Sequence, residues 1–101
     1  MYFENWEELE KISPIINGSW NKDFLYEYLA RSCDRKFAER LDAFFMEHRN
    51  DAALANLLFD FLLDEAYRGS DCQKGAAYYI ARLDKGLLRE EKERRLFSAR
   101  K

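Results

Sequence analysis

The chain has 101 residues, 48% of them hydrophobic and 36% charged, with a formal net charge of −2. That length suits one domain around one hydrophobic core. Valine and threonine are absent, and four isoleucines stand against thirteen leucines and eleven alanines. Strands are rich in β-branched residues, and four glycines and one proline are few for the turns of a sandwich or barrel. Composition therefore excludes a β-sheet protein, and sixteen aromatic residues argue against disorder.

Apolar residues recur at helical spacing through most of the chain. The first helix is expected over about 3–13 and ends before Pro14, and 14–21 is expected to be a loop with its turn at Asn17-Gly18. The following helices are expected over 22–32, from 34 to about 48, from 51 to a stop at Gly69, and from 70 to a stop at Gly86. A sixth, frayed helix or tail falls in the basic segment 85–101. Short connections predict antiparallel neighbours. The prediction is an all-α, single-domain antiparallel bundle of five or six helices, without a sheet.

Short polar side chains mark the starts of three of these helices. Asn21 is suited to cap the second helix, and the pair Asn50-Asp51 the fourth. Ser70 and Gln73 form the S-x-x-Q pattern of a capping box at the start of the fifth. Gly75 and the alanines after it are small enough to let two helices approach closely.

The sequence also predicts a subcellular location. The acidic start MYFENWEELE lacks the basic and apolar regions of a secretory signal, and no apolar run approaches the length of a membrane span. Cys33 and Cys72 lie 39 positions apart and are better interpreted as reduced thiols than as a disulfide. We therefore expect a cytoplasmic protein without a membrane partner.

Candidate catalytic residues are few. The single histidine, His48, lies on the apolar stripe of the third helix, where a half-buried structural imidazole is the ordinary explanation. Two distant cysteines and one histidine lack the paired spacing of a zinc site. Asp60 and Asp64 lie one helical turn apart, as in magnesium-binding helices, but those enzymes need a pocket larger than so small a bundle encloses. We expect no enzyme activity, no metal and no cofactor.

Charge is distributed unevenly along the chain. Residues 1–84 carry sixteen acidic and ten basic side chains, a net charge of −6, whereas residues 85–101 carry three and seven, a net charge of +4. The basic segment could contact nucleic acid, which is the alternative function. Its charges also form three i,i+4 pairs that are typical of a solvated helix, namely Glu90 with Arg94, Glu91 with Arg95 and Arg89 with Glu93. We favour the second interpretation.

The acidic body suggests a protein-binding surface. On a helical wheel of the fourth helix, the face opposite the core combines acids with an apolar and an aromatic side chain, and it consists of Asn56, Asp60, Leu63, Asp64 and Tyr67. The second helix repeats this mixture with Asp23, Tyr26 and Glu27. Either this face is exposed and binds a basic protein, or a further helix covers it and leaves the acids at the rim. The predicted partner-binding residues are Asp60, Asp64, Tyr67 and Asp71, with Asp23 and Glu27 as secondary candidates.

A segment near the C-terminal end resembles known proteins. The stretches Gly69-Ser70-Asp71-Cys72-Gln73, Gly75-Ala76-Ala77-Tyr78-Tyr79 and Leu83-Asp84 are similar to small bacterial immunity proteins of contact-dependent growth inhibition systems. The resemblance covers about a quarter of the chain and transfers no contact residues. It implies a cytoplasmic protein that binds and neutralises a cognate toxin. Many such toxins are nucleases with basic substrate channels, which an acidic inhibitor would fit.

Overall fold

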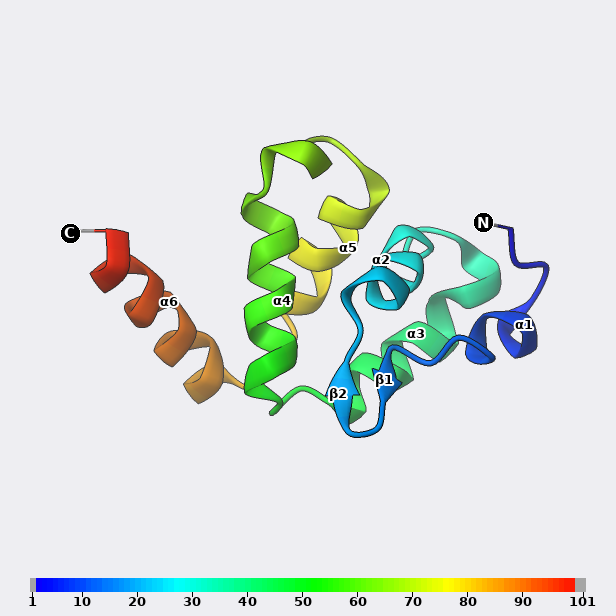
Figure 1. Ribbon diagram of the computed structural model, residues 1–101, viewed down its shortest axis with the longest axis horizontal. Helices are drawn as coiled ribbons and strands as arrows, with labels where there is room; N and C mark the ends of the chain where they lie inside the picture. Colours follow the sequence, from blue (N-terminus) through cyan, green and yellow to red (C-terminus); the bar gives the residue numbers. More distant parts are fainter. Residues whose placement is uncertain (1, 100–101) are drawn as a thin grey trace.

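The computed structural model describes residues 2–99, and the side chains as far as Leu96. Within these residues the chain is mostly helical, as predicted, and also contains one small hairpin and one 3₁₀ turn (Figure 1). The elements in chain order are α1 (Trp6–Glu10), β1 (Ile15–Ile16), β2 (Ser19–Trp20), α2 (Lys22–Ala30), α3 (Arg35–Glu47), α4 (Ala52–Leu63), the 3₁₀ turn η1 (Glu65–Tyr67), α5 (Asp71–Ile80) and α6 (Lys85–Ala99). None of the described helices is long and apolar enough to cross a membrane.

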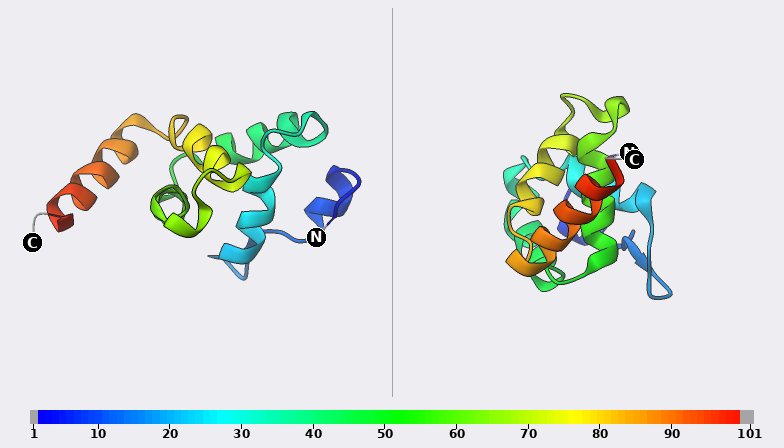
Figure 2. Two further views of the ribbon diagram at one scale, coloured as in Figure 1. Left: turned by 90° about the horizontal axis from the view of Figure 1, so that it is seen from above. Right: turned by 90° about the vertical axis from the view of Figure 1, so that its left-hand side faces the viewer.

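The centre of the molecule is formed by α2, α4 and α5. Helices α4 and α5 run antiparallel, and α5 also packs closely on α2 (Figure 1). Their buried side chains continue into those of α3, so one core spans the helices, and Leu25, Phe37, Leu54, Leu58 and Phe61 are almost completely inaccessible. The molecule measures 45 × 26 × 24 Å, with α1 and α6 at opposite ends of the long axis (Figure 2).

Gly75 lies where α5 approaches α2. A Cβ atom placed on Gly75 would lie 2.5 Å from the Leu29 carbonyl oxygen and 2.6 Å from Ser32 Oγ. The backbone of α5 therefore contacts the last turn of α2 directly. This agrees with the expectation that the small residues of this segment allow a close helix approach.

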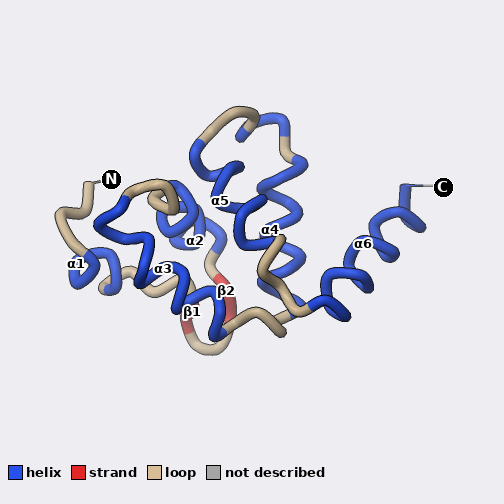
Figure 3. The backbone as a smooth tube through the Cα atoms, turned by 180° about the vertical axis from the view of Figure 1, so that it is seen from behind, coloured by secondary structure: helices blue, strands red, loops and turns tan. Residues whose placement is uncertain are grey.

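The predicted loop after Pro14 contains a two-stranded hairpin, so the prediction of no sheet was wrong in this detail (Figure 3). Ile15 pairs with Trp20 and Ile16 with Ser19 in antiparallel register. Asn17 and Gly18 have φ angles of 52° and 79°, which suit the two-residue turn of a hairpin. The Trp20 indole then donates a hydrogen bond of 3.0 Å to Asp51 Oδ2, which ties the hairpin to the start of α4.

The predicted helix starts are confirmed more often than the predicted ends. Asn21, Asp51 and Ser70 cap α2, α4 and α5 through hydrogen bonds to backbone N–H groups. The first helix is shorter than predicted, because Asn5 caps it at its start and the chain leaves it after Glu10. Gly86 was predicted to stop a helix but lies in the first turn of α6, where Asp84 Oδ2 accepts from its N–H at 3.1 Å.

The end of α4 also differs from the prediction. The helix stops at Leu63, six residues before Gly69, and Gly69 instead follows η1 with a φ of 76°. Gln73 fixes the connection at two points, since its Oε1 accepts from the Gly69 N–H at 2.8 Å and its Nε2 donates to the Leu62 carbonyl at 2.8 Å. The capping-box residue therefore also bridges α4 and α5.

Candidate partner-binding surface

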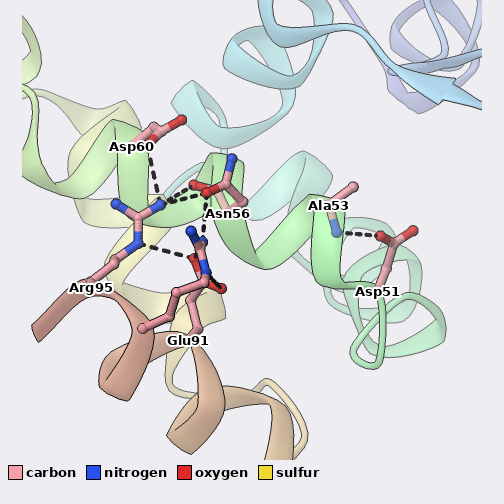
Figure 4. Close-up of polar contacts among 7 residues, drawn as sticks. Asp51, Ala53, Asn56, Asp60, Glu91 and Arg95 are labelled. Carbon is pink, nitrogen blue, oxygen red and sulfur yellow. Dashed lines mark hydrogen bonds and ion pairs between the residues drawn. The ribbon is translucent and has the colours of Figure 1, made fainter. Parts of the chain in front are cut away.

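Helix α6 partly covers the predicted acidic face of α4. Arg95 Nη2 donates to Asp60 Oδ1 at 3.2 Å, to Asn56 Oδ1 at 2.8 Å and to the Asn56 carbonyl at 2.9 Å (Figure 4). Of the two arrangements that the sequence left open for this face, the structure shows the covered one at Asn56 and Asp60. The Asp60 carboxylate is therefore part of the contact that holds α6.

A buried acid on α6 organises this contact. Glu91 is only 5% exposed and accepts hydrogen bonds from Arg95 Nε at 3.0 Å and from Arg94. The Arg95 guanidinium also lies 5.2 Å from the centre of the Phe59 ring. The expected i,i+4 pair of Glu91 and Arg95 is thus present, and it extends into a network with α4, whereas Arg94 pairs with Glu91 and not with the expected Glu90. Two basic residues of the C-terminal segment have a structural role in this network.

Replacing Arg95 by alanine should loosen α6. The substitution leaves the buried Glu91 carboxylate with Arg94 alone and removes the Arg95 bonds to Asn56 and Asp60, while Arg94 keeps its bond to Asn56 Oδ1. Removing one partner of a largely buried ion pair is expected to cost about 2 kcal/mol. Urea unfolding and amide hydrogen exchange of α6 measure the effect. The exposed Arg89 of the same helix provides the matched control, Arg89→Ala, and equal exchange of α6 in both variants would contradict the prediction.

A groove between α2 and η1 brings other predicted residues together. It has a volume of about 460 Å³ and is lined by Asp23, Tyr26, Glu27, Ala66, Tyr67 and Ser70. Asp23, Glu27 and Tyr67 were predicted as partner-binding residues, and Tyr26 was noted beside the first two. Sequence reasoning missed Ala66 and Ser70, because neither carries a charge or ring that would mark it. We call this set of six residues the acidic–aromatic groove.

The position of Tyr67 corrects the helical wheel of α4. The wheel placed Tyr67 on the face opposite the core, but the helix has ended before this residue. Asp64 caps η1 through a bond of 2.9 Å from the Ala66 N–H, and the turn directs Tyr67 back toward the core. The Tyr67 ring then lies 5.0 Å from the Phe61 ring and 5.8 Å from the Tyr26 ring.

The polar groups of the groove differ in their partners. Glu27 Oε1 accepts from Arg31 Nη1 at 2.9 Å, so its charge is compensated. The Asp23 carboxylate and the hydroxyls of Tyr26 and Tyr67 make no hydrogen bond or ion pair with any of the described residues. The groove therefore presents one unpaired carboxylate and two free hydroxyl groups beside two packed rings.

The remaining predicted acids lie outside the groove. Asp64 is exposed at the end of α4 and borders a smaller hollow of about 260 Å³ with Leu63, Glu65 and Arg68 among its lining residues. Asp71 is exposed in the first turn of α5, where a negative charge is favourable to the helix dipole. Three of the six predicted residues, Asp23, Glu27 and Tyr67, thus line the groove, and Asp60, Asp64 and Asp71 do not.

The histidine, the cysteines and the possible metal ligands form no further candidate site among the described residues. His48 ends α3, and its ring lies 5.5 Å from the Trp20 ring and 4.8 Å from the Phe44 ring, as expected for a structural imidazole. Cys33 is exposed and Cys72 buried, and both are free thiols. Among the residues that the structure describes, no three histidine, cysteine or acidic side chains are grouped to hold a metal ion.

Comparison with protein-family models, curated proteins and solved structures found no significant match to this chain.

Proposed function

We propose that this protein is a non-catalytic immunity protein that binds and neutralises a basic toxin in the cytoplasm, with a nuclease domain as the expected toxin. The observation that carries the proposal is the acidic–aromatic groove. It combines an unpaired carboxylate with two tyrosine rings, and aromatic residues surrounded by complementary charge are typical of binding hot spots. The resemblance of the segment 69–84 to immunity proteins supports the same function.

Nucleic-acid binding through the C-terminal segment is less well supported. Arg94 and Arg95 are engaged with Glu91, Asn56 and Asp60. Lys85, Arg89 and Lys92 are the exposed basic side chains that remain on the described part of α6, and they alternate with exposed acids. Such an interleaved surface is a weak match to a phosphate backbone.

The test uses the protein encoded immediately upstream as the candidate toxin. Co-expression should rescue cells from its toxic domain, and the two purified proteins should associate. The double variant Asp23→Lys, Tyr67→Ala should lose protection by at least about tenfold, since truncating a desolvated charge or aromatic anchor costs about 2 kcal/mol or more.

The control makes the same charge change elsewhere. Glu39 is an exposed acid on α3, outside the groove, and Glu39→Lys should leave protection intact. Circular dichroism must show equal helical content in both variants. Equal protection by the groove variant and the control would exclude the groove as the binding site, and absence of physical association would exclude the proposed function.

A further inference from the structure

We propose that the acidic–aromatic groove is a receptor for a single arginine side chain, which the toxin inserts as an anchor. The inference rests on the proposed function only for the source of that arginine. Arginine binding depends on the groove residues alone, so it can be tested with a small arginine derivative in the absence of a toxin.

The charge and shape of the groove select a cation. Its lining includes no basic side chain. Of its two carboxylates, Glu27 is paired with Arg31, whereas Asp23 has no partner among the described residues and carries the uncompensated charge. Tyr26 and Tyr67 both line the groove, with ring centroids 5.8 Å apart and ring planes tilted by 41°, and we call this pair the tyrosine wall. A cation is attracted to an aromatic face and to a carboxylate, whereas an anion would be repelled by both.

The chain itself shows which cation suits such a setting. The Arg31 guanidinium lies 4.6 Å from the centre of the Phe3 ring and binds Glu27, and that of Arg95 lies 5.2 Å from the Phe59 ring and binds Glu91. At these two places an arginine joins a carboxylate to an aromatic ring. The groove offers the same two acceptors, Asp23 and the tyrosine wall, without an arginine from the described chain.

Arginine fits the groove better than lysine for two physical reasons. A guanidinium is planar, so it can stack on the tyrosine wall while its edge donates two hydrogen bonds to Asp23. It is also less strongly hydrated than an ammonium group, which matters in a groove that is open to water. The unpartnered tyrosine hydroxyls can accept its remaining N–H groups.

The experiment is a nuclear magnetic resonance titration of the full chain with N-acetyl-arginine methylamide. Its lysine analogue and its neutral citrulline analogue are the matched probes. The arginine probe should bind in the millimolar range, shift the backbone signals of Tyr26, Ala66 and Tyr67, and bind several-fold more tightly than the lysine probe. The citrulline probe should not shift these signals. Equal affinity for lysine would overturn the preference for arginine, and binding of citrulline would overturn a cation site.

Two variants locate the site. Asp23→Asn removes the exposed carboxylate charge without changing its size and should weaken the arginine probe several-fold, whereas Glu39→Gln on α3 should not. Unchanged affinity in Asp23→Asn would overturn the proposal. A probe that binds the groove while toxin protection survives groove substitution would exclude the toxin as the source of the arginine and leave the arginine site itself standing. Protection that depends on the groove without any probe binding would refute the arginine anchor alone.

Discussion

Replacing Gly75 by alanine is expected to destabilise the fold, although alanine favours a helix. By helix propensity alone the substitution would stabilise α5 by about 1 kcal/mol. The added methyl group would however meet the Leu29 carbonyl oxygen at 2.5 Å, and that oxygen belongs to the backbone of α2. Helices α2 and α5 must then separate, and overpacking of this kind costs about 1–3 kcal/mol. The sign of the change therefore tests the helix contact directly.

Urea unfolding of Gly75→Ala measures the effect, and Gly86→Ala is its matched control. Gly86 also lies within a helix, but a Cβ atom there would meet only Asp84 Oδ2 at 3.3 Å. The control should be neutral or slightly more stable than the parent chain. A Gly75→Ala protein as stable as the control would mean that α2 and α5 are not in backbone contact.

The free energy of unfolding should also fall steeply in alkaline solution. Burial raises the pKa of the Cys72 thiol from 9.0 to about 12, against the opposing charge of Lys22. Burial, assisted by the charge of Glu10, raises the pKa of Tyr28 from 10.0 to about 12. Burial raises the pKa of Tyr79 further, with additional contributions from its hydrogen bond to Asp42 and from that carboxylate's charge. All three groups are held in their neutral form by the fold.

The direction of the pH dependence follows from these shifts. At a pH below the pKa that a group has in the unfolded chain, the group is neutral in both states. Its contribution to the free energy of unfolding is then fully present. Above that value the unfolded chain loses the proton while the folded chain keeps it, so unfolding becomes more favourable. Each group should then remove about 1.4 kcal/mol per pH unit until its folded pKa is reached. The loss begins near pH 9 for Cys72 and near pH 10 for the tyrosines.

Urea titrations between pH 8 and pH 11 measure this loss. Cys72→Ala should flatten the curve between about pH 9 and pH 10, where the tyrosines do not yet contribute. The variant will be less stable at every pH because it leaves a cavity, so the slope is the quantity to compare. Parallel curves for the parent and the variant would contradict the raised thiol pKa.

Features that depend on neighbouring residues were predictable from the sequence. Asn21, Asp51 and Ser70 cap helices because their short side chains reach backbone N–H groups two or three residues further on, which the order of residues alone specifies. The end of α4 was not predictable in this way. Gly69 is a typical terminator, but the Asp64 carboxylate caps a competing 3₁₀ turn five residues earlier and ends the helix first.

The candidate site likewise combines residues that the sequence could identify with residues that only tertiary contacts bring together. Asp23, Tyr26 and Glu27 share one face of a single helix, so their spacing identified them. Their opposite wall comes from η1, about forty residues away in sequence, and tertiary contacts such as the packing of Tyr67 on Phe61 bring it into place. The sequence equally could not decide whether another helix covers Asp60, because that depends on the contact of Arg95 with α4.

The two bonds of Gln73 have a consequence for the kinetics of partner binding. They hold both ends of the connection between Leu62 and Gly69, and Ser70, the next residue, donates from its Oγ back to the Tyr67 carbonyl at 2.6 Å. The η1 side of the groove is thus held in place before the proposed partner binds, so the conformational entropy lost on binding is small. Association should then proceed at a rate set by diffusion and charge attraction, and slow with added salt, without a subsequent conformational step.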